Sequence, residues 1–167
     1  TTSINYDAKN EQTIQFFTTV QNKLLWAISK QTAAELVHSR TDSAKPFLGM
    51  KSYDKKSEKK ITKKDVSIAK NYLKEIEIKE LNEIVTMYLD YAERQARQRK
   101  TVSMEQWADK LDAFLKFNEH DLLTHAGKVK AEVARKIAED RYEEFDRKRK
   151  KNEALTADEQ DLKLIEQ

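Results

Sequence analysis

The sequence predicts an all-α protein, an irregular bundle of six to seven helices around one long central helix. Only two Gly and one Pro occur in 167 residues, which leaves few residues for the tight turns of a β-rich protein. Apolar residues recur at helical spacing, and over 76–100 Leu81, Ile84, Val85, Tyr88 and Leu89 share one face. We therefore expect 76–100 to be the central helix.

The composition fits one soluble domain with a core, since charged residues make up 37% and hydrophobic residues 38% of the chain. No run of about 18 apolar residues occurs, so no membrane partner is expected. No signal peptide follows Thr1, and we expect a cytoplasmic protein whose position 1 is an internal boundary with a further segment upstream. Cysteine is absent, which excludes disulfides and thiolate metal sites.

In the first third of the chain, residues 1–9 are expected to form a flexible N-terminal arm, with Ile4 and Tyr6 as its anchors. The apolar spacing then predicts a helix over 10–29. Thr32 and Glu35 have the spacing of a capping box, which predicts a short helix through about residue 39. A long loop over 40–61 follows, because Pro46 and several lysines interrupt the helical pattern.

The remaining elements follow from further start and stop signals. A weaker cap over 62–65 predicts a helix to about residue 73. Ser103 as N-cap, with Val102 and Trp107 at staple spacing, predicts a helix to about 117. Gly127 ends a junction over 118–126, a helix is expected over 128–150, and a capping box over 156–159 predicts a separate terminal helix. We expect a helical domain over 10–151 and a loosely docked terminal helix over 152–167.

Three basic runs are candidates for contact with nucleic-acid phosphates, and solvated surface is the alternative explanation for each. They carry net charges of +5 over 51–64, +4 over 94–100 and +5 over 147–151. Acidic stretches alternate with them, and helix C-terminal ends favour cations in any case. The nucleic-acid candidates are Lys51, Lys55, Lys56, Lys59, Lys60, Lys63, Lys64, Arg94, Arg97, Arg99 and Lys100.

A second candidate site is the Pro/Gly turn RTDSAKPFLGM, residues 40–50. Arg40, Asp42 and Lys45 converge there and could bind an anion, or they could form a structural clamp in which Arg40 pairs with Asp42 or Glu35. No nucleophile with an adjacent base is recognisable, and His120 and His125 lack the i, i+4 spacing of two ligands on one helix face. We predict no catalytic residues, no cofactor and no metal, and leave enzymatic activity open, leaning against it.

Three blocks of the chain resemble the C-terminal region of the RhuM family, bacterial virulence-associated proteins found on mobile elements. They are FFTTVQNKLLWAISKQTAAELVHSRTDSAKPFLGM, DVSIAKNYLKEIEIKELNEIVTMYLDYAERQA and WADKLDAFLKFNEHDLLTHAGKV. The resemblance covers roughly residues 6 to 145, with departures at Phe47, Tyr53 and Lys130. It implies an upstream DNA-binding part and brings no catalytic residues. The matched polar positions are Arg40, Asp42, Lys45, Asn71, Asn82, Asp90, Glu93, Asp112 and Asn118.

The predicted function is an accessory, interaction or oligomerisation domain of a RhuM-type protein that assists DNA binding. Its expected partners are DNA, a second copy of the chain or another protein. The alternative is a toxin or enzyme domain with an anion-binding site at the loop from Arg40 to Gly49.

Overall fold

The computed structural model describes residues 3, 7, 9–51 and 60–165. Within these ranges the chain forms five α-helices and three short 3-10 helices, and the only β pairing is an isolated bridge between Ser3 and Val102. The all-α class is therefore confirmed, with slightly fewer helices than predicted. None of the described helices is both long enough and apolar enough to cross a membrane.

The first two helices begin where the sequence predicts. Helix α1 spans Glu11–Ser29, and the side chain of Asn10 accepts from the backbone N–H of Gln12. Helix α2 spans Ala33–Arg40 and begins with the predicted capping box, in which Thr32 and Glu35 satisfy each other's backbone N–H groups. The anchors expected in the N-terminal arm, Ile4 and Tyr6, lie outside the described residues.

The segment from 41 to 73 differs from the prediction. Three 3-10 turns, η1 Pro46–Gly49, η2 Asp65–Ser67 and η3 Ala69–Tyr72, occupy it, so the α-helix expected over 62–73 is absent. Ile68 is extended between η2 and η3, and the Asn71 amide donates to the carbonyl oxygen of Asp65 at 2.9 Å. The buried Tyr72 hydroxyl donates to the carbonyl oxygen of Val66 at 2.8 Å. These bonds hold the backbone in an alternative to a helix.

Helices α3 and α4 match their predictions closely. Helix α3 spans Glu75–Arg97, and α4 spans Met104–Phe117 with the predicted capping box between Ser103 and Gln106. Val102 and Trp107 are both buried, as their staple spacing indicates.

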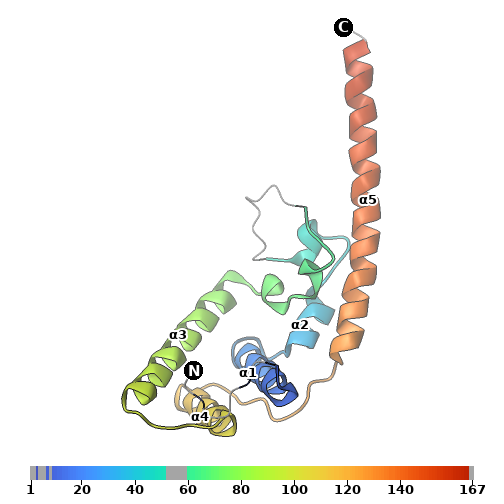
Figure 1. Ribbon diagram of the computed structural model, residues 1–167. Helices are drawn as coiled ribbons and strands as arrows, with labels where there is room; N and C mark the ends of the chain where they lie inside the picture. Colours follow the sequence, from blue (N-terminus) through green and yellow to red (C-terminus); the bar gives the residue numbers. More distant parts are fainter. Residues whose placement is uncertain (1–2, 4–6, 8, 52–59, 166–167) are drawn as a thin grey trace.

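Helix α5 is continuous over Ala131–Ile165, which corrects the prediction of two helices. No Gly or Pro interrupts 131–165, and Thr156 does not act as a cap, because its hydroxyl donates to the carbonyl oxygen of Asn152 one turn earlier at 2.9 Å. Figure 1 shows α5 along one side of the molecule, its C-terminal half standing clear of the other helices.

Two hydrophobic clusters divide the core. Helix α1 supplies buried residues to both, whereas α3 adds only the partly buried Ile78 and Leu81 to the larger one. The larger joins α2, η2, η3 and α5 around Leu36, Tyr72 and Ala138, and it includes Leu25 of α1. The smaller joins α1, α3 and α4 through Ala27, Ile84, Leu111 and Leu115. The long helix α3 therefore lies at one side of the bundle (Figure 1) instead of at its centre.

Candidate nucleic-acid interface

Two lysines at the end of the predicted 40–61 loop and just beyond it, Lys60 and Lys63, pair with acidic residues of α5. Lys60 Nζ lies 3.4 Å from a carboxylate oxygen of Glu153. Lys63 Nζ lies 3.4 Å from Glu139 and 3.0 Å from Glu143. Lys51 and Lys64 are exposed, and Lys55, Lys56 and Lys59 lie outside the described residues. The paired lysines fasten this segment to α5, so they are less available to an external anion.

Three cations of the basic run over 147–151, at 148–150, form ion pairs with acidic residues of the same helix, α5. Lys148 Nζ lies 2.6 Å from Glu144, and Lys150 Nζ lies 2.8 Å from Asp146. Arg149 also pairs with Asp146. These are pairs at i, i+3 and i, i+4 spacing, which support an exposed helix.

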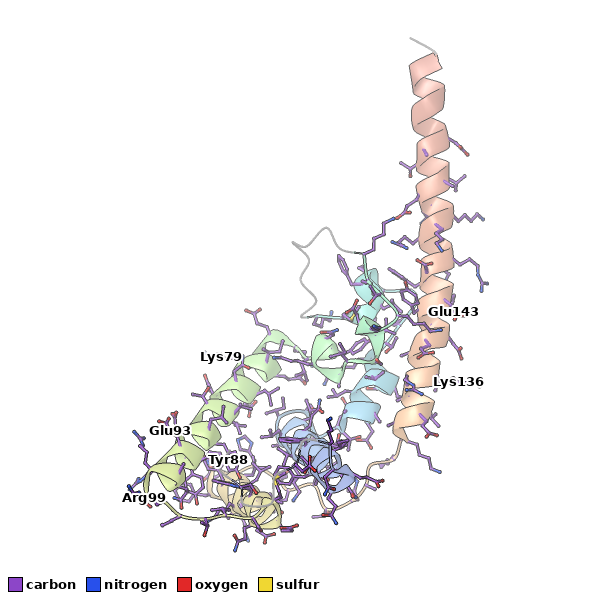
Figure 2. The ribbon with its side chains drawn as sticks, viewed as in Figure 1. Lys79, Tyr88, Glu93, Arg99, Lys136 and Glu143 are labelled. Atoms are coloured by element: carbon purple, nitrogen blue, oxygen red, sulfur yellow. The ribbon has the colours of Figure 1, made fainter. Side chains whose placement is uncertain are left out.

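The third run, at the end of α3, has almost no acidic partners. Arg94, Arg99 and Lys100 are exposed and form no ion pair with a described residue, and Arg97 lies 4.0 Å from Glu93. The predicted candidates therefore do not form one surface. Figure 2 places Arg99 at the end of α3, across the molecule from Lys136 and Glu143 of α5.

We call residues 94–110, where α3 ends and α4 begins, the α3–α4 corner. The chain turns there because Arg99 takes a left-handed conformation with φ 53°. Its N–H donates to the carbonyl oxygen of Ala96 at 2.9 Å, and the N–H of Lys100 donates to that of Gln95 at 3.3 Å. Glycine usually occupies such a position after a helix, since an L side chain strains it. An arginine is held there instead.

A hollow of about 580 Å³ lies in the α3–α4 corner. It is lined by Gln95, Arg99, Lys100, Thr101, Val102, Gln106, Asp109 and Lys110. The helix dipole explains cations in the last turn of α3, but Lys110 comes from the next helix. Its Nζ lies 3.3 Å from the Tyr91 hydroxyl and 5.9 Å from the centre of the Tyr91 ring. Cations from α4 and from the turn that precedes it thus face one hollow.

An aromatic cluster supports the α3–α4 corner from inside. The rings of Tyr88 and Trp107 meet edge to face with centroids 6.1 Å apart, and Tyr91 meets Trp107 in the same way. The Tyr88 hydroxyl donates to the carbonyl oxygen of Trp107 at 2.7 Å, and burial raises the pKa of that hydroxyl. Figure 2 shows Tyr88 facing inward from α3. The two helices that carry the cations are therefore fixed relative to each other.

Arg40, in the second predicted site, is an internal clamp. Its two terminal nitrogens donate to both carboxylate oxygens of Glu77 at 2.6 and 2.7 Å, and one also donates to the carbonyl oxygen of Tyr72 at 3.0 Å. A structural clamp was one of the two predictions for this loop, but the partner of Arg40 is Glu77 and not Asp42 or Glu35. These hydrogen bonds hold the pKa of Glu77 below its usual range.

Asp42 and Lys45 stay at the surface and do not converge with Arg40. A carboxylate oxygen of Asp42 accepts from the backbone N–H of Ala44 at 2.9 Å, and Lys45 Nζ lies 3.3 Å from the same carboxylate. A hollow of about 810 Å³ between residues 43–46 and α5 is lined by Lys45 and Arg149 but not by Arg40. The three predicted residues therefore do not form one anion site.

The sequence analysis did not identify four polar residues that have important contacts in the structure. Glu77 and Arg141 act through long-range contacts, and Arg141 donates to the carbonyl oxygens of His38 and Thr41 at 2.8 and 2.6 Å. Gln95 and Lys110 join the hollow only because α4 folds back beside α3. Only Arg141 had a sequence signal, as a cation within an otherwise apolar helical stripe.

Two histidines have structural contacts. The His125 ring meets Trp26 edge to face with centroids 4.7 Å apart, and its Nδ1 accepts from the N–H of Gly127 at 3.0 Å. His120 Nδ1 lies 3.9 Å from Glu80. In the described part of the chain, no three His, Asp or Glu side chains are grouped so that they could hold a metal ion.

A family model described as "Virulence protein RhuM family" matches residues 1–153. No curated protein and no solved structure matches the chain significantly.

Proposed function

Because the chain belongs to the virulence protein RhuM family, we propose that it is a non-enzymatic accessory domain that assists DNA binding, and that the α3–α4 corner contacts the phosphates. The observation that carries the proposal is the difference in pairing between the three basic runs. Lys60, Lys63 and the cations over 148–150 have acidic partners within the protein, and Lys51, Lys64, Arg147 and Lys151 of the same two runs form no ion pair with a described residue. In the run at 94–100 three of the four cations, Arg94, Arg99 and Lys100, have no acidic partner among the described residues.

Unpaired surface cations suit phosphate contact for a physical reason. A cation that already holds a carboxylate must give up that contact before it can neutralise a phosphate. An unpaired cation has no such contact to lose. When it neutralises a phosphate, the DNA releases condensed counterions, and that release drives non-specific association. The +3 net charge of the whole chain is small, so the local excess at the α3–α4 corner matters more than the total.

The experiment is fluorescence anisotropy with a labelled duplex over a salt series. The test variant is Arg94→Glu with Lys100→Glu, and the matched control is Lys130→Glu with Lys136→Glu. The control residues are exposed cations at the start of α5, without ion pairs in the described structure, and both variants change the net charge equally. Each phosphate contact contributes about 0.9 to the slope of log affinity against log salt. We expect the test variant to lose about two such contacts and the control to keep the slope.

Equal effects of the two variants would mean that only net charge matters, and would contradict the assignment to the α3–α4 corner. The absence of any binding at low salt would remove nucleic acid from the function of this domain.

Helix-mediated self-association is the second candidate function, with a second copy of this chain as the partner. Ile14 of α1 and Leu89 of α3 support it, because both are large apolar side chains that are more than half exposed. Sedimentation equilibrium over a concentration series tests it. We expect dimers that Leu89→Lys weakens, and a monomer at every concentration would contradict this candidate.

A further inference from the structure

We infer that the hollow in the α3–α4 corner is a pocket for one terminal phosphate monoester of a nucleic-acid strand. The inference rests on the proposed function and deepens it, because it names the group that this surface receives. Three observations carry it: an amide that opens into the hollow and has no partner among the described residues, a charge balance that suits a dianion, and donors that come from two helices and the turn between them.

Gln95 is the first observation. Its side chain is buried, with only 8% of the residue exposed, and it lines the hollow. Its backbone oxygen accepts from Lys100, but its amide forms no hydrogen bond with any described residue. Among the described residues, the indole N–H of Trp107 is the one side-chain polar group that is sealed from solvent without a partner. The Gln95 amide is not such a group, so it stays within reach of the hollow that it lines. The amide therefore has a free N–H donor for a ligand oxygen.

The charge balance is the second observation. Arg99, Lys100 and Lys110 face the hollow with Asp109, which gives three cations and one carboxylate, a formal balance of +2. A phosphate monoester carries about −1.5 to −2 near neutral pH, whereas an internal phosphodiester carries a single negative charge. The pocket thus matches the charge of a terminal phosphate more closely than that of a phosphate within the strand.

The third observation is how the donors are placed. Gln95 belongs to α3, Lys110 to α4, and Arg99 and Lys100 to the turn between them. Phosphate oxygens point in several directions, so a site with donors on several sides can bond more than one of them. The left-handed Arg99 helps, since it turns the chain so that the start of α4 lies beside the end of α3.

The experiment compares three forms of one short duplex, labelled at an internal base: with 5′-phosphate ends, with 3′-phosphate ends and with hydroxyl ends only. We expect at least one phosphorylated form to bind the wild-type chain about tenfold more tightly than the hydroxyl form. Gln95→Leu, which keeps the size of the side chain, should reduce that ratio to about one, and Lys110→Gln should reduce it partly. Equal affinities of all three forms for the wild-type chain would overturn the inference.

Gln95→Glu separates loss of phosphate binding from loss of folding, because the new side chain keeps the shape and polarity of glutamine but its negative charge repels phosphate. It should abolish the preference while the circular dichroism spectrum and the melting temperature stay near wild type. A preference that survives in Gln95→Glu would overturn the inference. Competition with inorganic phosphate, against chloride at equal ionic strength, tests the source of the contact. Selective loss of the preference with phosphate supports the pocket, and equal loss with chloride overturns it.

The two proposals fail in different ways. If the hydroxyl-ended duplex binds with a steep salt dependence and phosphorylation adds nothing, the proposed function stands and the pocket does not. If only the phosphorylated forms bind, the pocket stands, and contact with internal phosphates is wrong.

Discussion

Arg40 is the last residue of α2 and Arg99 lies just beyond the end of α3, yet the structure uses them in opposite ways. Arg40 is mostly buried, and its guanidinium meets both oxygens of Glu77. Arg99 is exposed and strained, and it has no acidic partner in the described structure. The first arginine stabilises the fold, whereas the second adds charge without adding stability. The role of a cation in this protein therefore depends on whether an acidic side chain pairs with it.

The comparison makes the two regions separable by experiment. Variants near Arg40 should change the free energy of unfolding, and variants at the α3–α4 corner should change binding.

The largest effect is expected from Arg40→Met, which leaves the buried Glu77 carboxylate without its cation. Removing one partner of a buried ion pair costs about 3–5 kcal/mol, and urea denaturation measures this loss. Arg40→Met combined with Glu77→Met should recover part of it, because no charge then stays buried. A loss of less than about 1 kcal/mol is the usual range for an exposed pair. Such a result would contradict the claim that Arg40, unlike Arg99, stabilises the fold.

Gly49→Ala should also destabilise the Arg40 region. Gly49 has φ +80°, and an added Cβ would lie 2.5 Å from the carbonyl oxygen of Arg40. The strained backbone alone costs on the order of 1–3 kcal/mol for a residue with a side chain. Thermal unfolding measures the change. Gly127→Ala is a useful comparison, because its added Cβ would meet the Thr32 side chain at 3.0 Å and not a backbone atom. Equal effects would show that the close approach to Arg40 is unimportant.

Arg99→Gly should separate stability from binding in a single variant. Glycine relieves the left-handed strain, so the free energy of unfolding should rise by about 1 kcal/mol, while the affinity for DNA should fall severalfold with the lost charge. Lys30→Gly is the matched control, since Lys30 is also a left-handed cation after a helix, with φ 56°. It pairs with Asp121 at 2.8 Å, outside the α3–α4 corner. A loss of DNA affinity as large in Lys30→Gly would refute the distinction.

The smallest effect is expected in the pH dependence of stability. The Arg40 hydrogen bonds lower the pKa of Glu77 from its ordinary value of 4.5. A lowered pKa in the folded state means that stability is present above 4.5 and is lost as the pH falls through the folded pKa. Glu77→Gln should therefore be less stable than wild type near neutral pH, and the gap should narrow below 4.5. Denaturation at several pH values measures it, and a constant gap would contradict the clamp.

Local signals in the sequence predicted local structure well. The capping boxes at Thr32 and Ser103 each begin a helix, because the two side chains that satisfy the backbone are only three residues apart. The same pattern at Thr156 failed, because the N-cap residue of a capping box is itself extended, whereas Thr156 lies inside the continuous helix α5. A cap signal therefore predicts a helix start only after an element that has ended.

The candidate site was less predictable, because ion pairing in this fold is long-range. Lys60 pairs with Glu153, and Arg40 pairs with Glu77, at sequence separations of 93 and 37 residues. The run of cations at 94–100 could be read from the sequence, but its lack of partners could not. Gln95 falls on the apolar side of α3 and carried no sign that its amide would lack a partner.

Helix α5 is packed against the other helices near its start but not near its end, and this difference should affect amide hydrogen exchange along it. Near its start, Ala134 and Ala138 are buried against the other helices, whereas every residue over 150–158 is exposed. An isolated stretch of helix is marginal in water without a packed face. Exchange should therefore be slow over 134–142 and quicken steadily toward 158, as the helix frays from its far end without unfolding the core. The turns of α5 beyond Glu153, which pairs with Lys60, can then change conformation independently of the bundle that carries the α3–α4 corner.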